Sequence, residues 1–168
     1  MNKDDILQFY EYNYWATSKV LNAAARISAD QFIAPMGLTF GSIRGSLVHA
    51  LGAEIIWRMR FQEGISLSAL PAEDEFPDIN MLTERWKREE TLMRNYLDKL
   101  TEADLTTIFK YKNTKGVPFE NTLWHLLVHV VNHGTQFRGD AAVGLTQLNQ
   151  SPGDLDMLLY FRESQKSA

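Results

Sequence analysis

Four long segments of the sequence repeat apolar residues at the spacing of an α-helix, and this periodicity constrains the fold more than any other feature. It predicts four helices, over residues 3–26, 43–62, 80–100 and 122–147. The stretches between these segments contain prolines and glycines, which mark loops. A shorter helix is expected over residues 154–162. Four long helices joined by loops predict an all-α protein built as a four-helix bundle with a short C-terminal helix.

Local signals support several of the predicted helix ends. Ser42 is a good N-cap for the second long helix, because its side chain can accept a hydrogen bond from the first turn. Asn121 or Thr122 can cap the fourth long helix in the same way. Between the third and fourth long helices, residues 108–117 can form a short strand or hairpin.

Length and composition exclude several classes of protein. A chain of 168 residues, 45% of them apolar, predicts a single domain over residues 1–168 with a sizeable core. A net charge of −4 without a basic patch argues against nucleic-acid binding. We expect a cytoplasmic protein with no membrane partner, because no apolar run could cross a bilayer and the N-terminus does not read as a secretory signal. With no cysteine in the chain, any metal must be held by histidine and carboxylate side chains.

Three of the four histidines, His125, His129 and His133, lie four residues apart in the fourth predicted helix. Residues at this spacing share one face of a helix, and two imidazoles so placed can bind one metal ion. The fourth histidine, His49, lies in the second predicted helix. We hypothesise that the fold brings His49 against the histidine face of the fourth helix to make a metal site.

Two glycines flank His49 in its helix, at Gly45 and Gly52. Glycine inside a helix costs roughly 1 kcal/mol relative to alanine, so its presence there calls for a reason. Two explanations remain open. Either a backbone segment or a ligand comes close to this helix near His49, or the helix packs tightly against its neighbour.

Four stretches of the chain resemble the DinB family, also called the DinB/YfiT-like metalloenzymes. They are Tyr12-Asn-Tyr-Trp-Ala16, Ser46-Leu-Val-His-Ala-Leu-Gly-Ala-Glu-Ile-Ile-Trp57, His129-Val-Val-Asn-His-Gly-Thr-Gln-Phe-Arg-Gly139, and the ending Ser151-Pro-Gly-Asp-Leu-Asp156 with Phe161-Arg-Glu163. The resemblance implies an up-down-down-up four-helix bundle, commonly a homodimer. It also implies a divalent metal, most often zinc or nickel, bound by three histidines, which by position are His49, His133 and residue 137.

The chain departs from the family pattern at residues 137 and 140. Residue 137 is Phe, and the residue after Gly139 is Asp140, where the family usually has Gln or Glu. Three interpretations follow. His129 replaces the lost ligand after a small rotation of the helix, or His49 and His133 hold a metal weakly with water or a carboxylate such as Glu54, or the site binds no metal.

The resemblance implies an enzyme that uses its metal to activate a low-molecular-weight thiol, which attacks a small electrophilic substrate. The chemistry is coherent, because a bound cation lowers the pKa of a coordinating thiol. The alternative is a non-catalytic bundle that binds a small molecule or dimerises. Of the three candidate functions, the one that we favour least is metal-assisted hydrolysis with Glu54 as general base. Arg138 could hold an anionic substrate, but an ion pair with an acidic surface residue is the favoured interpretation.

Overall fold

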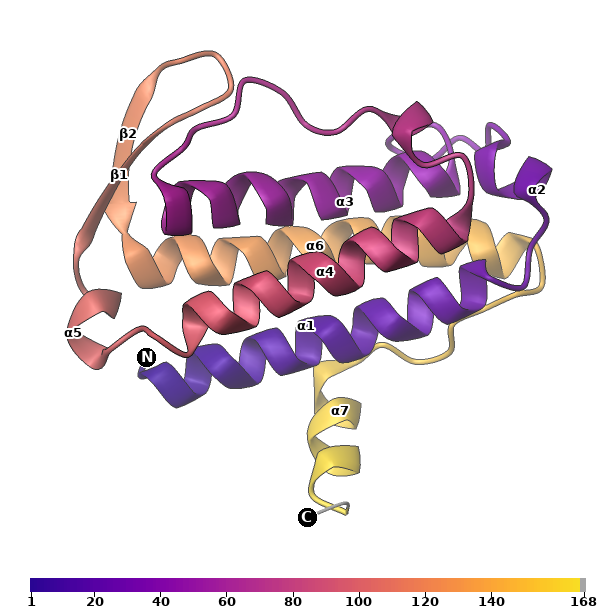
Figure 1. The fold of residues 1–168 in the computed structure, drawn as a ribbon. Helices are drawn as coiled ribbons and strands as arrows, with labels where there is room; N and C mark the ends of the chain where they lie inside the picture. The colour runs from indigo at the N-terminus through magenta and orange to yellow at the C-terminus, as the bar shows by residue number, and fades with distance from the viewer. Residues whose placement is uncertain (167–168) are drawn as a thin grey trace.

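Four long helices lie side by side in the computed structural model, which describes residues 1–166 (Figure 1). They are α1 (Lys3–Ala24), α3 (Ile43–Arg58), α4 (Ile79–Leu97) and α6 (Leu123–Gln147). The shorter elements are α2 (Ala29–Ile33), the π-helical turn η1 (Met59–Glu63), the 3-10 turn η2 (Glu73–Glu75), α5 (Glu102–Leu105) and α7 (Met157–Ser164). The helical periodicity therefore predicted each long helix to within a few residues. No helix within residues 1–166 combines the length and apolar character needed to cross a bilayer.

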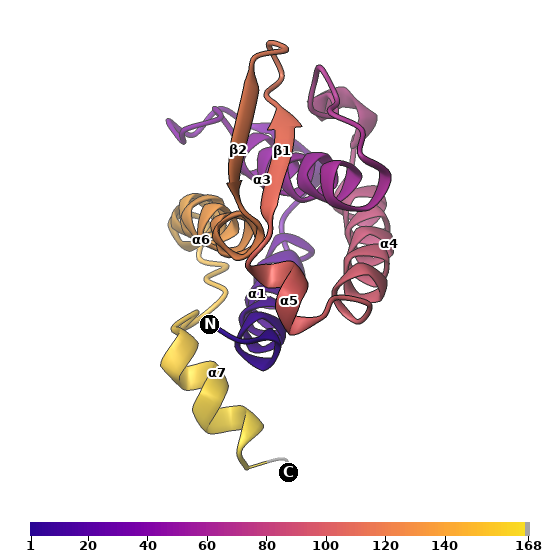
Figure 2. The same ribbon diagram turned by 90° about the vertical axis from the view of Figure 1, so that its left-hand side faces the viewer.

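The all-α prediction is wrong at one end of the molecule, where two strands form a hairpin. Strand β1 (Ile108–Lys112) pairs antiparallel with β2 (Pro118–Thr122), and Ile108 lies opposite Thr122. The turn between the strands is closed by Asn113, whose side-chain oxygen accepts hydrogen bonds from the backbone of Lys115 and Val117. The chain forms strands here because β-branched and aromatic residues flank a turn sequence. Figure 2 shows the hairpin standing over the ends of α3 and α6.

Helix capping follows the sequence signals in part. The Ser42 hydroxyl accepts a hydrogen bond of 2.9 Å from the backbone of Gly45 and so caps α3 as predicted. Thr122 is the N-cap residue of α6, but its side chain makes no capping bond. The reason is that Thr122 is also the last residue of β2, so the strand runs directly into the helix. The start of α6 is thus set by the hairpin.

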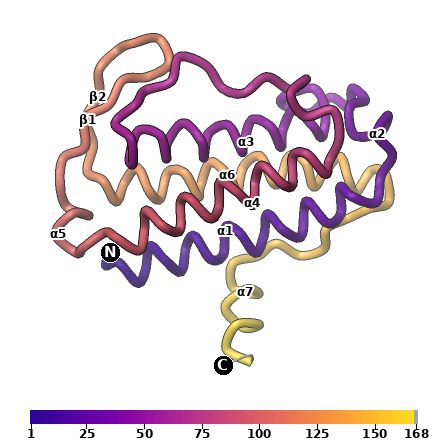
Figure 3. The backbone as a smooth tube through the Cα atoms, viewed as in Figure 1, coloured from indigo at the N-terminus to yellow at the C-terminus, as the bar shows by residue number. Residues whose placement is uncertain are grey.

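The long helices pack in a four-cornered arrangement. α6 lies against α1 and α3, and α4 lies against the same two helices from the other side. Two clusters of buried apolar residues fill the interior, one towards α2 and one towards the hairpin. The connection from α3 to α4 runs back along the length of α3, as the tube in Figure 3 shows. It covers one face of α3, and Leu70 and Pro71 approach Gly52 so closely that a Cβ there would lie 2.8 Å from a Leu70 methyl carbon.

A buried ion pair joins α3 to α4. The carboxylate of Glu89 is fully buried and accepts hydrogen bonds from the guanidinium of Arg58 and, at 2.9 Å, from Arg85. Arg58 is itself buried. Two opposite charges taken out of water stabilise a fold only while both partners are present.

We expect Glu89→Ala to lower the free energy of unfolding by roughly 3–5 kcal/mol, because it leaves the Arg58 charge buried without a partner. Urea denaturation followed by circular dichroism measures the change. Glu84→Ala, an exposed position on the same helix, is the matched control and should change stability by less than about 0.5 kcal/mol. Similar losses in the two variants would contradict a structural role for the buried pair.

Candidate functional site

His49 of α3 and His133 of α6 meet where these two helices pack together. Their imidazole ring centres lie 5.0 Å apart and the ring planes are inclined at 38°. Two imidazoles that bind the same tetrahedral cation, at about 2 Å each, place their ring centres about 5 Å apart. Both side chains are half-buried. The fold therefore brings His49 against the histidine face of α6, with a ring separation that is compatible with a shared metal.

Phenyl rings surround this histidine pair. Phe40, from the loop before α3, stacks on the His49 ring with ring centres 3.8 Å apart and planes 18° apart. Phe137 is buried, and its ring centre lies 4.4 Å from that of His49 and 4.6 Å from that of His133. Residue 137 thus faces the pair, as the family resemblance implies for a third ligand, but it presents a phenyl ring in place of a nitrogen donor.

Asp140 holds the Phe40 loop against the helices. Its carboxylate accepts hydrogen bonds from the Thr39 backbone at 3.2 Å and from the Ser46 hydroxyl. Gly45 makes room for the same loop, because a Cβ there would lie 2.0 Å from the carbonyl oxygen of Phe40. Close approach of a backbone segment is therefore the correct explanation for this glycine. The stacking role of Phe40 was missed from the sequence, since no local pattern connects a loop residue to the face of a distant helix.

The other two histidines lie further from the pair. The His129 ring centre is 5.8 Å from that of His133, and its exposed ring lies edge-on to Trp57 at 5.5 Å. His125 is exposed and contacts Trp124. Within residues 1–166, no three or more histidine and carboxylate side chains are grouped to hold a metal ion. The residues present therefore fit a pair of donors and do not fit a set of three, and a ligand role for His129 stays a prediction.

The clustered histidines are neutral at physiological pH. Burial, together with the smaller effects of nearby His49 and His129, lowers the pKa of His133 to about 4. Burial also lowers the pKa of His49 and of His129. Neutral imidazole is the form that binds metals. The Nδ1 atom of His133 is buried and has no hydrogen-bond partner among the described residues, which leaves this polar atom free for a ligand.

Arg138 does not pair with an acidic surface residue, so that expectation is wrong. Its guanidinium is buried between α6 and α1, where it donates hydrogen bonds to Asn13, Thr17 and Thr135. Gly134, one turn earlier, provides the space, because a Cβ there would lie 2.7 Å from an Arg138 nitrogen. The sequence signal that could have indicated the burial of Arg138 is the glycine four residues before it in an apolar helix.

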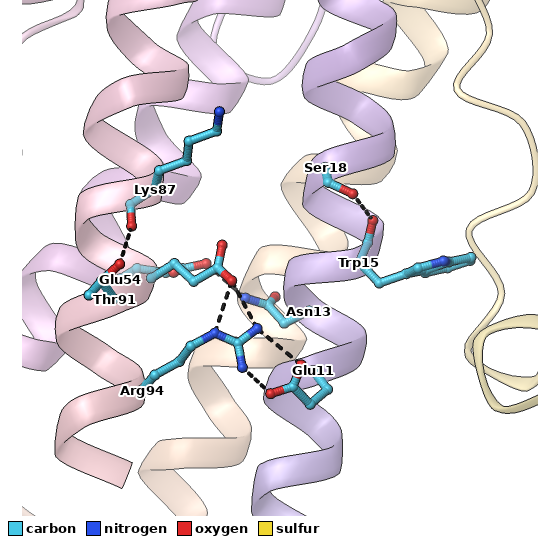
Figure 4. Close-up of polar contacts among 9 residues, drawn as sticks. Glu11, Asn13, Trp15, Ser18, Glu54, Lys87, Thr91 and Arg94 are labelled. Carbon is cyan, nitrogen blue, oxygen red and sulfur yellow. Dashed lines mark hydrogen bonds and ion pairs between the residues drawn. The ribbon is translucent and has the colours of Figure 1, made fainter. Parts of the chain in front are cut away.

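Glu54 belongs to the same buried polar group. In Figure 4 Glu54 and Asn13 lie between the long helices, and the Asn13 amide donates a hydrogen bond of 2.9 Å to one carboxylate oxygen. No hydrogen bond or ion pair joins Glu54 to a histidine within residues 1–166. Burial raises the pKa of Glu54 to about 7, against the lowering effects of the Asn13 hydrogen bond and the Arg138 charge. The geometry therefore gives no support to Glu54 as a metal ligand or as a base beside a metal.

The raised pKa of Glu54 makes stability depend on pH. The folded chain keeps a proton on this carboxylate that the unfolded chain releases, so the contribution of Glu54 to wild-type stability falls as pH rises from about 4.5 to about 7, while the lowered pKa of His133 acts in the opposite direction. Glu54→Gln removes this dependence. We expect the variant to gain roughly 3 kcal/mol relative to wild type between about pH 4 and about pH 8.

Denaturant unfolding at a series of pH values measures this difference for Glu54→Gln. The free energy of unfolding of Glu84→Gln, a change at an exposed position, should differ from that of wild type by the same amount at every pH. Parallel stability curves for Glu54→Gln and wild type would mean that the pKa of Glu54 is the same in the folded and the unfolded chain.

Known proteins match the chain over nearly its whole length. The sequence model of the DinB family matches residues 1–167. The chain is 25% identical over 170 residues to Protein DinB of Bacillus subtilis (strain 168), and the match covers 98% of this chain and 99% of that protein. The fold is similar to the crystal structure of the conserved protein of locus from Enterococcus faecalis, with a TM-score of 0.59 and 14% identity over 82% of this chain and 92% of that one.

These matches agree with the sequence motifs and with the observed helices. The structural likeness, at 14% identity, supports the fold alone. The family match extends over both histidine-bearing helices, α3 and α6. On this basis, the chain belongs to the DinB family.

Proposed function

We propose that His49 and His133 form a weak site for a divalent transition metal and that the chain is a metal-dependent member of its family with one ligand missing. The observation that carries the proposal is the 5.0 Å separation of two imidazole ring centres from different helices. The unpartnered Nδ1 of His133 supports it, as does the neutral state of both rings. Zinc and nickel are the metals that imidazole donors favour here.

The phenyl ring of Phe137 sets the expected strength of this site. Catalytic zinc sites usually have three protein ligands and one open position. A pair of histidines leaves more positions to water or substrate, so binding is weaker. Phe40 contacts the His49 ring, and Phe137 contacts the rings of both His49 and His133. The exposed ring of His129 lies at the edge of the cluster, where a substrate could reach it.

The next part of the proposal concerns the reaction that the metal site would support. A bound divalent cation would supply a Lewis acid that lowers the pKa of a coordinating low-molecular-weight thiol. The chain has no cysteine, so the thiol must come from outside the protein. The chain's own part is to present two imidazoles whose pKa values are lowered, with the aromatic rings of Phe40 and Phe137 beside them. The proposed class is therefore a thiol-using transferase acting on a small electrophile.

The second candidate is a non-catalytic bundle that binds a small molecule or dimerises. Phe137 favours it, because a buried phenyl ring occupies the place of a ligand and makes the cluster more apolar. Under this alternative the histidines pack with the phenyl rings and bind no metal. The two candidates differ in one measurable property, metal binding by the unmodified chain.

The proposal extends to the arrangement and setting of the chain. In Figure 1, α1 and α6 run in one direction and α3 and α4 in the other, which supports the up-down-down-up bundle that the resemblance implies. We also propose that the chain forms a homodimer and is located in the cytoplasm. Size-exclusion chromatography with light scattering tests the dimer.

We expect the tag-free protein to bind zinc or nickel weakly, His133→Ala to lose this binding, and Phe137→His to increase the affinity at least about tenfold by restoring a third donor. Equilibrium dialysis followed by elemental mass spectrometry measures metal per chain. His125→Ala is the matched control, because His125 lies on the same helix and outside the cluster.

The outcomes separate the two candidates. No metal on the wild-type chain, with binding by Phe137→His, would identify a degenerate site that one substitution repairs. Unchanged affinity in Phe137→His would show that residue 137 does not reach a bound metal, and metal binding that persists in His133→Ala would overturn the two-histidine proposal.

A further inference from the structure

The outer edge of strand β1 carries backbone hydrogen-bonding groups that point away from β2. Antiparallel strands exchange hydrogen bonds at every second residue pair, and the backbone N–H of Asn113 donates to the Val117 carbonyl at 2.9 Å. In the register that follows from this bonded pair, Ile108, Lys110 and Lys112 belong to the pairs that are not bonded to β2. The N–H and C=O groups of these three residues therefore face the outer edge of the hairpin, as in an unpaired edge strand.

The loop after η1 lies beside this edge, and a cavity separates the two. The backbone N–H of Lys112 donates a hydrogen bond of 3.2 Å to the hydroxyl of Ser66, which confirms that this N–H points outward. The cavity has a volume of about 720 Å³ and is lined on the loop side by Ser66 and on the hairpin side by residues that include Lys110. Within residues 1–166, no hydrogen bond reaches the outward groups of Ile108 and Lys110. The unbonded edge at Lys110 thus borders the cavity.

The outer edge of β2 is protected, whereas that of β1 is not. β2 begins with Pro118, which has no backbone N–H, and Pro118 lies opposite Lys112 in a pair whose backbone groups face outward. Proline at such a position prevents another strand from bonding there. β1 contains no proline and keeps an N–H at every residue. A further strand can therefore bond more completely to β1 than to β2.

Lysines along β1 favour an acidic partner. Lys110 and Lys112 are exposed and lie on the same face of the strand, because side chains alternate between the two faces. Residues 108–122 hold three lysines and one glutamate, although the whole chain has a net charge of −4. These lysines disfavour pairing with a second copy of β1, since lysines would then lie opposite lysines. They favour a strand that has acidic side chains at the same alternate positions.

Aromatic rings occupy the other face of β1. The Phe109 ring contacts Phe61 of η1, and the Tyr111 ring contacts Trp57 of α3, so this face lies against the helices. Phe119 of β2 stacks on Tyr111 with ring centres 6.0 Å apart, lines the cavity and is 49% exposed. Apolar side chains that alternate with acidic ones on an added strand would lie on this aromatic face. The β1 edge thus matches a strand in which acidic and apolar residues alternate.

We propose that the outer edge of β1 binds an extended segment of a partner protein in which acidic and apolar residues alternate, and that this segment adds a third strand to the hairpin. Its backbone bonds to Ile108 and Lys110 and supplies affinity, and its side chains set the specificity. A hairpin of two strands is marginally stable by itself, so a third strand also stabilises the hairpin. The surface uses neither histidine of the proposed metal site.

The probe is a fluorescein-labelled, end-capped peptide of alternating glutamate and valine. Binding is measured by fluorescence anisotropy in a chelator, so that the result does not depend on metal at the histidine pair. We expect saturable binding. The same peptide with N-methyl groups on its amides keeps the charge and the side chains but cannot donate hydrogen bonds, and it should bind at least about tenfold more weakly. A peptide with lysine in place of glutamate should also bind at least about tenfold more weakly.

Lys110→Pro is the matching change in the protein, because the Lys110 N–H faces outward and its removal breaks no hydrogen bond to β2. This variant should weaken peptide binding at least about tenfold. Lys110→Gln keeps the N–H and loses only the charge, so it should weaken binding by a smaller, several-fold factor. Lys87→Gln is the control, since Lys87 is exposed on α4, and it should bind the peptide within twofold of wild type.

Absence of saturable binding would overturn the proposal. Equal binding of the N-methylated peptide, or unchanged binding by Lys110→Pro, would show that no strand is added at this edge, and the peptide comparison decides this even if Lys110→Pro does not fold. Equal binding of the lysine peptide would overturn the acidic assignment. Dimerisation without peptide that Lys110→Pro abolishes would identify a second copy of the chain as the occupant and would also overturn the proposal.

Discussion

The close packing of α3 against α6 is the constraint on which the rest of the structure depends. Glycines lie where neighbouring segments approach these helices. A Cβ on Gly45 would meet the Phe40 carbonyl, and one on Gly144 would lie 2.9 Å from an Ile43 side-chain carbon. Asp140 then ties the preceding loop to both helices. His49 and His133 lie in contact because the helices that carry them are held this closely.

Three buried arginines of this bundle have three different kinds of partner. Arg58 has a full ionic partner in Glu89, which also links α3 to α4. Arg138 has neutral hydrogen-bond acceptors, and it shares Asn13 with the buried carboxylate of Glu54. Arg60 has only aromatic rings. The first two arrangements give the guanidinium hydrogen-bond acceptors within residues 1–166, and the third gives it cation–π contacts.

Trp57 joins the histidine cluster to the start of the π-helical turn. Its ring contacts His129, at the edge of the cluster, and the guanidinium of Arg60. Phe137 packs against His133 with ring centres 4.6 Å apart, but its phenyl ring offers no donor nitrogen.

Features that depend on residues within one or two helical turns were readable from the sequence. The long helices, the Ser42 cap and the shared face of His129 and His133 follow from spacing alone, because a helix places neighbours four residues apart on one side. Family motifs added the pairing of His49 with His133. The start of α6 depends only partly on nearby residues, because the helix follows directly after a strand and has no side-chain cap.

Features that depend on distant segments were decided by the tertiary structure. Nothing near Arg138 in the sequence shows that Asn13 and Thr17 will surround it, so the expected surface ion pair was wrong. Nothing near Arg60 shows that no carboxylate will approach it. The sequence by itself determined the helices and which side chains share a face, because these follow from local geometry. Only the tertiary structure decided which charges are buried and which of them lack a partner, because burial and pairing depend on what the rest of the chain places around each residue.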